Sequence, residues 1–228
     1  FLVIVGILFS AVSFAQPDHN LWNTVLKDHV SESGLVNYKG LKNNPEPLYT
    51  YLNELSTHQP ESNWTREERI SYWINTYNAY TLKLILDNYP VESIKNIKNP
   101  WDQSFIPYEN GLISLNHLEH KILRKMDEPR IHFAIVCASV SCPSLLNEAY
   151  SAQMLNEQLD KVTRQFLNDP SKNSFDPEKI EVSKIFKWFS KDFKSNGGPL
   201  EFIKQYKEIT ISKKSQLSYK EYNWQLNE

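Results

Sequence analysis

Hydrophobic positions recur along most of this chain with the spacing of an α-helix, which predicts a mostly helical fold. Helical spacing is found over residues 21–30, 48–55, 66–89, 114–126, 151–168 and 183–193. The longest of these segments begins with a capping box, in which Thr65 is the N-cap and Glu68 is the third helical residue. It is expected to end before Pro90, because the residue before a proline is disfavoured in a helix.

One segment has the pattern of a buried β-strand. Residues 130–137, with the sequence RIHFAIVC, are almost continuously apolar or β-branched, which is typical of a central strand covered on both faces. Shorter strands are predicted near residues 179–182, 209–211 and 219–226. We therefore expect an α+β fold, a mostly helical single domain around a small sheet with one central buried strand at about 130–138.

The first 14 residues, FLVIVGILFSAVSF, are apolar and uncharged, and their length suits the hydrophobic region of a signal peptide. Small residues follow, so we expect a signal peptide at 1–15, cleavage after Ala15 and a single globular domain at 16–228. The alternative is a buried N-terminal helix. Since no later segment reaches about 18 consecutive apolar residues, we expect a secreted or periplasmic protein without stable membrane insertion after cleavage.

The composition narrows the classes of function. The chain has 228 residues, of which 40% are hydrophobic and 23% are charged, so it is long and apolar enough to build its own core. Its net charge of −2 offers no basic surface for a nucleic acid. With 6 glycines and no Gly-x-Gly-x-x-Gly motif, it gives no sign of a nucleotide cofactor, and no cofactor is predicted. The expected partner is a small molecule, a peptide or a glycan.

Candidate chemistry is concentrated around the two cysteines, Cys137 and Cys142, in the sequence CASVSCP. Cys137 ends the predicted strand, where functional residues are common, and a small polar loop follows it. Three interpretations stay open: a disulfide that clips the loop, a nucleophilic Cys137 thiolate beside a histidine, or a metal site completed by two histidines. On a strand, His132 would face the side opposite Cys137, so we expect a buried histidine bonded to a backbone group.

Glu119 is the least ordinary residue of the predicted helix at 114–126. On a helical projection, it falls inside the arc formed by the apolar residues of that helix. Because a bare buried carboxylate is costly, Glu119 must be paired or protonated, which leaves open an ion pair or an acid–base group with a raised pKa. His120 falls near the edge of the arc and would reach Cys137 if this helix packed against the strand, whereas His117 faces away.

Asn75 and Asn78 are similarly unusual on the long helix at 66–89. They lie three residues apart, so they share a helix face that is otherwise apolar. Two buried amides need hydrogen-bond partners, which are either the backbone of a loop, such as the turn from Cys137 to Cys142, or a ligand.

At these positions, the chain resembles the domain-of-unknown-function family 547. The resemblance is carried by YWINTYNA at 72–79, LEHKILR at 118–124, PRIHFAIVCASVSCP at 129–143 and SKIFKWF at 183–189. The family has no established activity, and the resemblance implies an exported bacterial protein, with a hint of thiol chemistry from plant relatives that carry glutaredoxin-like modules. Its motif residues correspond here to Trp73, Asn75, Asn78, Glu119, His120, Arg130, His132, Cys137, Ser141, Cys142 and Pro143. His117 departs from the expected pattern, which weakens a metal site built on His117 and His120.

Together, these features give a leading hypothesis of a thiol-dependent hydrolase or acyl-transferase. Cys137 would be the nucleophile, His120 the base and Glu119 the residue that holds His120 or the substrate. Asn75 or Asn78 would supply an oxyanion donor, and His132, Ser141 and Cys142 complete the predicted binding residues. The alternatives are a thiol–disulfide redox protein, or a binding module in which a Cys137–Cys142 disulfide clips a loop and aromatic residues such as Trp101 and Tyr108 line a groove.

Overall fold

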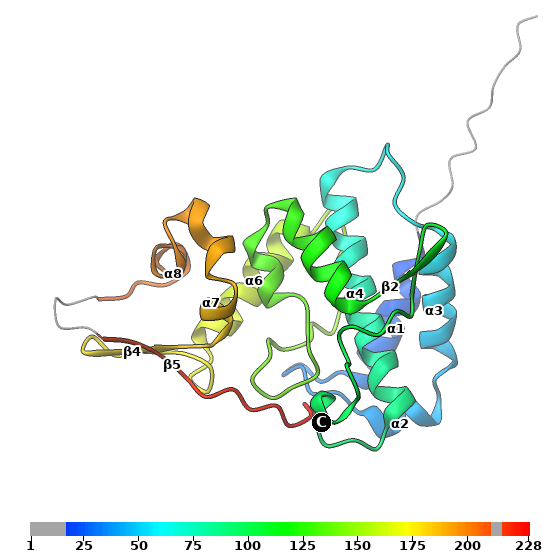
Figure 1. The fold of residues 1–228 in the computed structure, drawn as a ribbon, viewed down its shortest axis with the longest axis horizontal. Coiled ribbons are helices and arrows are strands. Elements are labelled where there is room, and N and C mark those ends of the chain that lie inside the picture. The colour runs from blue at the N-terminus through cyan, green and yellow to red at the C-terminus, as the bar shows by residue number, and fades with distance from the viewer. Residues whose placement is uncertain (1–16, 211–215) are drawn as a thin grey trace, which may run out of the picture.

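The computed structural model describes residues 17–210 and 216–228 (Figure 1). The predicted signal peptide at 1–15 and part of the predicted strand at 209–211 lie outside these residues. The architecture is the expected mostly helical α+β fold, with two small sheets. No helix in the described part of the chain is long and apolar enough to cross a membrane.

The centre of the fold is helix α4 (Arg66–Asn88), which begins with the predicted capping box. The Thr65 side chain accepts a hydrogen bond from the Glu68 backbone N–H, and the Glu68 carboxylate accepts one from the Thr65 N–H. Every residue from 70 to 82 is buried. A helix that is buried all round must be covered on every side, and α4 therefore organises the rest of the chain.

Around α4, the N-terminal helices form one part of the molecule (Figure 1). These are α1 (His19–His29), α2 (Tyr38–Asn43) and α3 (Glu46–Thr57), and they are followed by the short 3₁₀ helix η1 (Ile94–Asn96). Strands β1 (Ile106–Tyr108) and β2 (Gly111–Ile113) form an antiparallel hairpin. The hairpin leads directly into the helix that carries Glu119 and His120.

The second part of the molecule contains α6 (Leu155–Asn168), α7 (Ile185–Trp188), the 3₁₀ helix η5 (Ser190–Asn196) and α8 (Pro199–Tyr206). A three-stranded sheet pairs β3 (Ser174–Phe175) with β4 (Lys179–Val182) antiparallel, and β4 with β5 (Gln216–Tyr219) parallel. The core here is a cluster of phenylalanine rings with centroids 4.9–6.5 Å apart, formed by Phe133, Phe166, Phe186, Phe193 and Phe202. This cluster holds η5 against the helix that precedes Cys137.

The predicted central strand at about 130–138 is wrong, although its burial is right. Residues Pro129–Phe133 form a 3₁₀ helix, η4, which Glu128 caps by accepting a hydrogen bond from the Arg130 N–H. The chain from 134 to 136 is buried and pairs with no strand. Its polar backbone groups bond to Asn78 instead, whose amide donates to the Ala134 carbonyl and accepts from the Val136 N–H, both at 3.0 Å. The Asn78 side chain thus makes the backbone hydrogen bonds that a neighbouring strand would otherwise make.

The predicted strand at 219–226 is also largely wrong, since β5 ends at Tyr219. Beyond it, the C-terminal segment, residues 220–227, runs along the loop from Cys137 to Cys142 (red in Figure 1). The Val140 N–H donates to the Gln225 carbonyl, the Ser141 N–H donates to the Asn223 carbonyl, and Ser139 forms an isolated bridge with Leu226. The middle of the loop, residues 139–141, is therefore fixed by partners that are distant in sequence.

We predict that Asn78→Ala destabilises the protein by about 2–4 kcal/mol, because it leaves a buried carbonyl and a buried N–H unpaired. Urea unfolding measures the change in the free energy of unfolding. The matched control is Asn53→Ala on the exposed face of α3, for which a change within about 0.5 kcal/mol is expected. Equal effects of the two substitutions would contradict the role given to Asn78.

Candidate functional site

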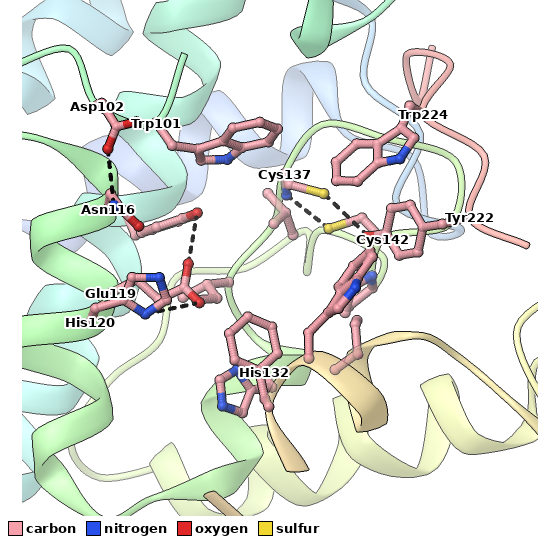
Figure 2. A pocket seen from close by; sticks show the side chains of 17 residues that line it. Trp101, Asp102, Asn116, Glu119, His120, His132, Cys137, Cys142, Tyr222 and Trp224 are labelled. Atoms are coloured by element: carbon pink, nitrogen blue, oxygen red, sulfur yellow. Dashed lines mark hydrogen bonds and ion pairs between the residues drawn. The ribbon is translucent and has the colours of Figure 1, made fainter. Parts of the chain in front are cut away.

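A cavity of about 310 Å³ lies where the helix after β2, the Cys137–Cys142 loop, α7 and the C-terminal segment meet (Figure 2). Glu119 and His120 enter from one side, and Cys137, Tyr222 and Trp224 lie on the other. Seventeen residues line the cavity: Tyr77, Trp101, Asp102, Asn116, Glu119, His120, His132, Ile135, Val136, Cys137, Cys142, Pro143, Ile185, Trp188, Phe189, Tyr222 and Trp224. The fold thus brings the predicted Cys137, His120 and Glu119 into one cavity.

The Cys137 sulfur is surrounded by groups that can donate hydrogen bonds. Its Sγ lies 3.1 Å from the Ser139 hydroxyl and 3.3 Å from the Tyr222 hydroxyl, and the Cys137 N–H donates to Cys142 Sγ. Ala138, between Cys137 and Ser139, has a φ of 54°, in the left-handed region that alanine rarely adopts. This strained residue turns the chain so that the Ser139 hydroxyl comes back towards the sulfur of Cys137.

These contacts favour a thiolate at Cys137. Burial alone would raise the pKa of the Cys137 thiol, but hydrogen bonds from Cys142, Ser139 and Tyr222 lower it below its ordinary value. Burial and the neighbouring Cys137 raise the pKa of Cys142, and burial keeps Tyr222 protonated by raising its pKa. Both cysteines are free thiols in this structure, so the disulfide that one interpretation requires is not formed.

Glu119 is buried, as its position on the helical projection predicted. One carboxylate oxygen, Oε2, accepts a hydrogen bond from the Tyr77 hydroxyl at 3.4 Å, and the other, Oε1, is buried without a hydrogen-bond partner. Burial raises the pKa of Glu119 from 4.5 to about 7, against the lowering effect of Arg124 and Tyr77. Near neutral pH, the side chain therefore exists in both the protonated and the charged form, as an acid–base group requires.

The helix that carries Glu119 and His120 is irregular. It starts as α5 (Leu115–His117), widens into a π-helical turn, η2 (Leu118–Ile122), and tightens into a 3₁₀ turn, η3 (Leu123–Met126). A π turn inside a helix is rare and is frequent at functional sites. Here it places two consecutive polar side chains, Glu119 and His120, towards one cavity, while His117 is exposed as predicted.

His120 belongs to a network of charged and polar groups rather than to a pair with Cys137. Its Nδ1 accepts a hydrogen bond from Arg124 at 2.8 Å, and since arginine only donates, the neutral ring carries its proton on Nε2. Burial and the Arg124 charge lower the pKa of His120, which keeps the ring neutral. No hydrogen bond joins His120 to the Cys137 sulfur, and Glu119 Oε1 lies 4.0 Å from the His120 Nδ1.

The same network corrects the expectation for His132. Its Nε2 bonds to the Asp192 carboxylate at 2.7 Å instead of to a backbone group, and its ring stacks on Phe189. Arg124 binds both oxygens of Asp192, at 2.6 and 2.7 Å. Burial alone would raise the pKa of Asp192, but the bonds from His132 and Arg124 lower it, and burial lowers the pKa of His132. Asp192, which does not itself line the cavity, therefore holds Arg124 and the cavity-lining His132 in place.

Three of the predicted site residues hold the backbone and do not line the cavity. The Asn75 amide exchanges two hydrogen bonds with the Tyr150 backbone, and Asn78 holds residues 134–136 as described above. The Ser141 hydroxyl accepts a hydrogen bond from the Asn223 N–H. Because the Asn75 and Asn78 amides both bond to buried backbone groups, neither is placed to stabilise an oxyanion in the cavity.

Several residues that shape the site were not among those predicted. Tyr222 supplies a hydroxyl to the thiol, Arg124 sets the tautomer of His120, and Asp192 anchors Arg124 and His132. Arg124 follows His120 by four residues, so helical spacing would have placed the two side by side. No local pattern links Tyr222 or Asp192 to the cysteines, since they are brought there only by the fold.

The described residues contain no group of three or more histidine, cysteine or carboxylate side chains that could hold a metal ion. His117, the second histidine of the weakened metal interpretation, is exposed and does not line the cavity. The arrangement found therefore combines a thiol, two hydroxyls, a carboxyl group and an imidazole.

Comparison with known proteins agrees with the resemblance in part of the chain. No curated protein and no solved structure matches this chain. The family model described as "Protein of unknown function, DUF547" matches residues 61–167, which include α4, Glu119, His120 and both cysteines. The residues of the cavity wall beyond Pro143, which are Ile185, Trp188, Phe189, Tyr222 and Trp224, lie outside the matched segment. The chain contains a DUF547 domain over residues 61–167.

Proposed function

We propose that this protein is a thiol-dependent enzyme of the hydrolase or acyl-transferase type, with Cys137 as its nucleophile. The main support for the proposal is the position of the Cys137 sulfur in the cavity. The Cys137 thiol, which three hydrogen-bond donors stabilise as a thiolate, shares a cavity with Glu119, a carboxyl group whose pKa is about 7. A nucleophile and an acid–base group in one cavity are the minimum that acyl transfer needs.

The first half of the reaction would form a thioester. The Cys137 thiolate attacks the carbonyl carbon of the substrate, and the electron pair of the C=O bond moves to its oxygen. When the tetrahedral intermediate collapses, the bond to the leaving group breaks, and protonated Glu119 gives its proton to that group. The Ser139 and Tyr222 hydroxyls, already at 3.1 and 3.3 Å from the sulfur, lie beside the reacting atoms.

The second half would regenerate the thiol. Water, or a second nucleophile, attacks the thioester carbonyl, and the now charged Glu119 takes up the proton that this nucleophile loses. The Cys137 sulfur leaves as the thiolate, which its donors stabilise. Water gives hydrolysis and any other nucleophile gives acyl transfer, so the same residues serve both reactions.

Glu119 suits the proton transfers better than His120 does. The Nδ1 of His120 is occupied by Arg124, and its Nε2 already carries a proton in the neutral ring. His120 therefore serves as a hydrogen-bond donor, which fits a role in polarising the substrate carbonyl or stabilising the oxyanion. The roles of Arg124 and Asp192 are to hold His120 in this state.

We propose a small molecule, a peptide or a glycan as the substrate and an exported location for the protein. The cavity size supports a substrate of this kind, since pockets of about 300–1,000 Å³ accommodate small molecules or short segments of larger ones. The apolar segment at 1–14 supports export. Because export exposes thiols to oxidants, it also bears on the state of the two cysteines.

The proximity of the two cysteines supports a second candidate, thiol–disulfide exchange. The Cys137 N–H bonds to Cys142 Sγ, and the thiols hydrogen-bond to each other. In this reaction, the Cys137 thiolate attacks a partner disulfide, and Cys142 then displaces the partner as a thiol, leaving a Cys137–Cys142 disulfide and a reduced partner.

The acyl-transfer proposal predicts that p-nitrophenyl acetate gives a burst of about one p-nitrophenolate per reduced protein molecule, because the acyl-enzyme forms faster than it is hydrolysed. Peptide mapping by mass spectrometry should find the acetyl group on Cys137. Cys137→Ser should abolish the burst, and Cys142→Ser should keep it.

A burst that survives in Cys137→Ser would contradict the proposal, as would acetylation confined to lysines. The redox alternative is distinguished by glutathione disulfide. A redox protein gives a Cys137–Cys142 disulfide and loses this reaction in Cys142→Ser, whereas an acyl-transfer enzyme gives the burst.

Tyr222→Phe should shift the pH profile of Cys137 alkylation by iodoacetamide to higher pH, because the ring stays and only the donor to the thiolate is lost. The rate at neutral pH should fall about tenfold, since a hydrogen bond to a charged group contributes about 1.5 kcal/mol. The control is Tyr219→Phe, which removes a hydroxyl from the nearby strand β5. Identical profiles for wild type and Tyr222→Phe would rule out this role.

Glu119→Gln should stabilise the protein at pH 8 while slowing acyl transfer. A folded-state pKa of about 7 against 4.5 means that the folded protein holds this proton longer than the unfolded chain. The associated stability is complete below about pH 4.5 and is lost as pH rises through 7, for a total of about 3 kcal/mol. Glutamine mimics the protonated form at every pH, so the gain should be near zero at pH 4.5 and largest above pH 7.

Chemical denaturation across this pH range measures the effect of Glu119→Gln. The matched control is Glu221→Gln, which neutralises an exposed carboxylate on the C-terminal segment and should leave the pH dependence unchanged. If the gain in unfolding free energy of Glu119→Gln over wild type is no larger at pH 8 than at pH 4.5, the folded protein does not disfavour the charged form of Glu119, and the prediction is wrong.

A further inference from the structure

The ionisable side chains of the cavity wall are acidic or neutral. They include the carboxyl groups of Asp102 and Glu119 and the neutral rings of His120 and His132, and no lysine or arginine among the described residues lines the wall. Arg124 lies behind the wall, with both oxygens of Asp192 bound to its guanidinium. A substrate with a carboxylate or phosphate would therefore find no cation to bind and two acidic groups to repel it.

Asp102 is held in place but is not neutralised. One of its oxygens, Oδ1, accepts a hydrogen bond from the Asn116 amide at 2.9 Å, and the Asn116 N–H donates to the Trp101 carbonyl at 2.9 Å. The side chain is exposed, and no ion pair to Asp102 is found among the described residues. A rigid carboxylate without a counter-ion at a cavity mouth is suited to bind a cation.

Glu119 gives an independent indication of the same ligand chemistry. Its Oε1 atom is buried, lacks a hydrogen-bond partner and belongs to a side chain that points into the cavity (Figure 2). Buried acceptors without partners are rare because they cost about 1–3 kcal/mol each. An ammonium or guanidinium group would supply the missing donor.

The remaining wall is aromatic and can also attract a cation. Trp224 contacts Trp101, Trp188 and Tyr222, with centroid distances of 5.6, 5.9 and 4.6 Å. The faces of such rings carry negative electrostatic potential and bind ammonium groups, and tryptophan binds them best. The ammonium of Lys95, which does not line the cavity, already lies 5.2 Å from the centroid of the Trp224 ring.

We infer that the substrate carries a cationic ammonium or guanidinium group, which binds in the cavity between Asp102, Glu119 and the rings of Trp101 and Trp224. This inference rests on the proposed function only in calling the ligand a substrate. The charge preference of the cavity is a property of its wall and can be measured without turnover.

The test uses three methanethiosulfonate reagents that modify Cys137 in the reduced, full-length protein. One carries a trimethylammonium group, one a sulfonate and one only a methyl group, and each rate is divided by its rate with free 2-mercaptoethanol. After this correction, the trimethylammonium reagent should react about tenfold faster than the sulfonate. Peptide mapping confirms that Cys137 is the residue modified.

Matched substitutions locate the origin of the preference. Asp102→Asn keeps an acceptor for Asn116 and should lower the rate ratio of the cationic to the anionic reagent several-fold, whereas Asp28→Asn, on the exposed face of α1, should leave it unchanged. Trp224→Leu should also lower the ratio, and Trp224→Phe should retain most of it. The ratio cancels any change in the reactivity of the thiol itself.

Equal corrected rates for the cationic and anionic reagents would overturn the inference. So would equal effects of Asp102→Asn and Asp28→Asn, which would show a response to net charge only. A methyl reagent faster than the cationic one would assign the aromatic wall to an apolar group. The proposed function fails separately, if p-nitrophenyl acetate does not acetylate Cys137.

Discussion

The two hydrogen bonds between the Asn78 amide and the backbone of residues 134 and 136 are the constraint on which the site depends. They lie in the core, where unpaired backbone groups are costly, and they bind the chain that leads to Cys137 directly to the central helix. The position of the sulfur is therefore set by α4, the most buried element of the fold. In an antiparallel or parallel sheet, the same chain would be held by a neighbouring strand, and its side chains would alternate between two faces. Held by one amide, it is free to turn at Ala138 and to present its thiol to a cavity.

Around this fixed point, the site combines satisfied and unsatisfied polar groups. Arg124 bonds to His120 and to Asp192, and Asp192 also bonds to His132 Nε2. In contrast, Glu119 Oε1 and His132 Nδ1 are buried without hydrogen-bond partners. Such unpaired buried groups lower the stability of the fold. The raised pKa of Glu119 follows from this arrangement, because burial penalises the charged carboxylate more than its neighbours compensate. The strained Ala138 and the π turn at 118–122 are further departures from regular geometry within the same small region.

The cavity is assembled from two parts of the chain that differ in their relation to known proteins. The thiol, the carboxyl group and the imidazole lie in the DUF547 domain, while Trp188, Phe189, Tyr222 and Trp224 lie beyond it. The wall of the cavity is thus built by both parts, since Trp101, Asp102 and Glu119 lie inside the matched segment and Trp188 and Trp224 lie beyond it. The Tyr222 hydroxyl connects the two parts, because it belongs to the C-terminal segment and bonds to the thiol.

The sequence by itself determined the elements with strong local signals. Hydrophobic spacing and the capping box predicted α4, and the position of Glu119 within an apolar arc predicted its burial, because both depend on residues a few positions apart. The buried amides of Asn75 and Asn78 were correctly expected to need hydrogen-bond partners. The apolar run at 130–137, however, has the same pattern whether its backbone groups bond to a neighbouring strand or to a side chain. Only the tertiary structure decided that question. The tertiary structure alone also brought Asp192 to His132, 60 residues away, and Tyr222 to Cys137, 85 residues away. Local sequence patterns do not indicate which distant segments will pack together.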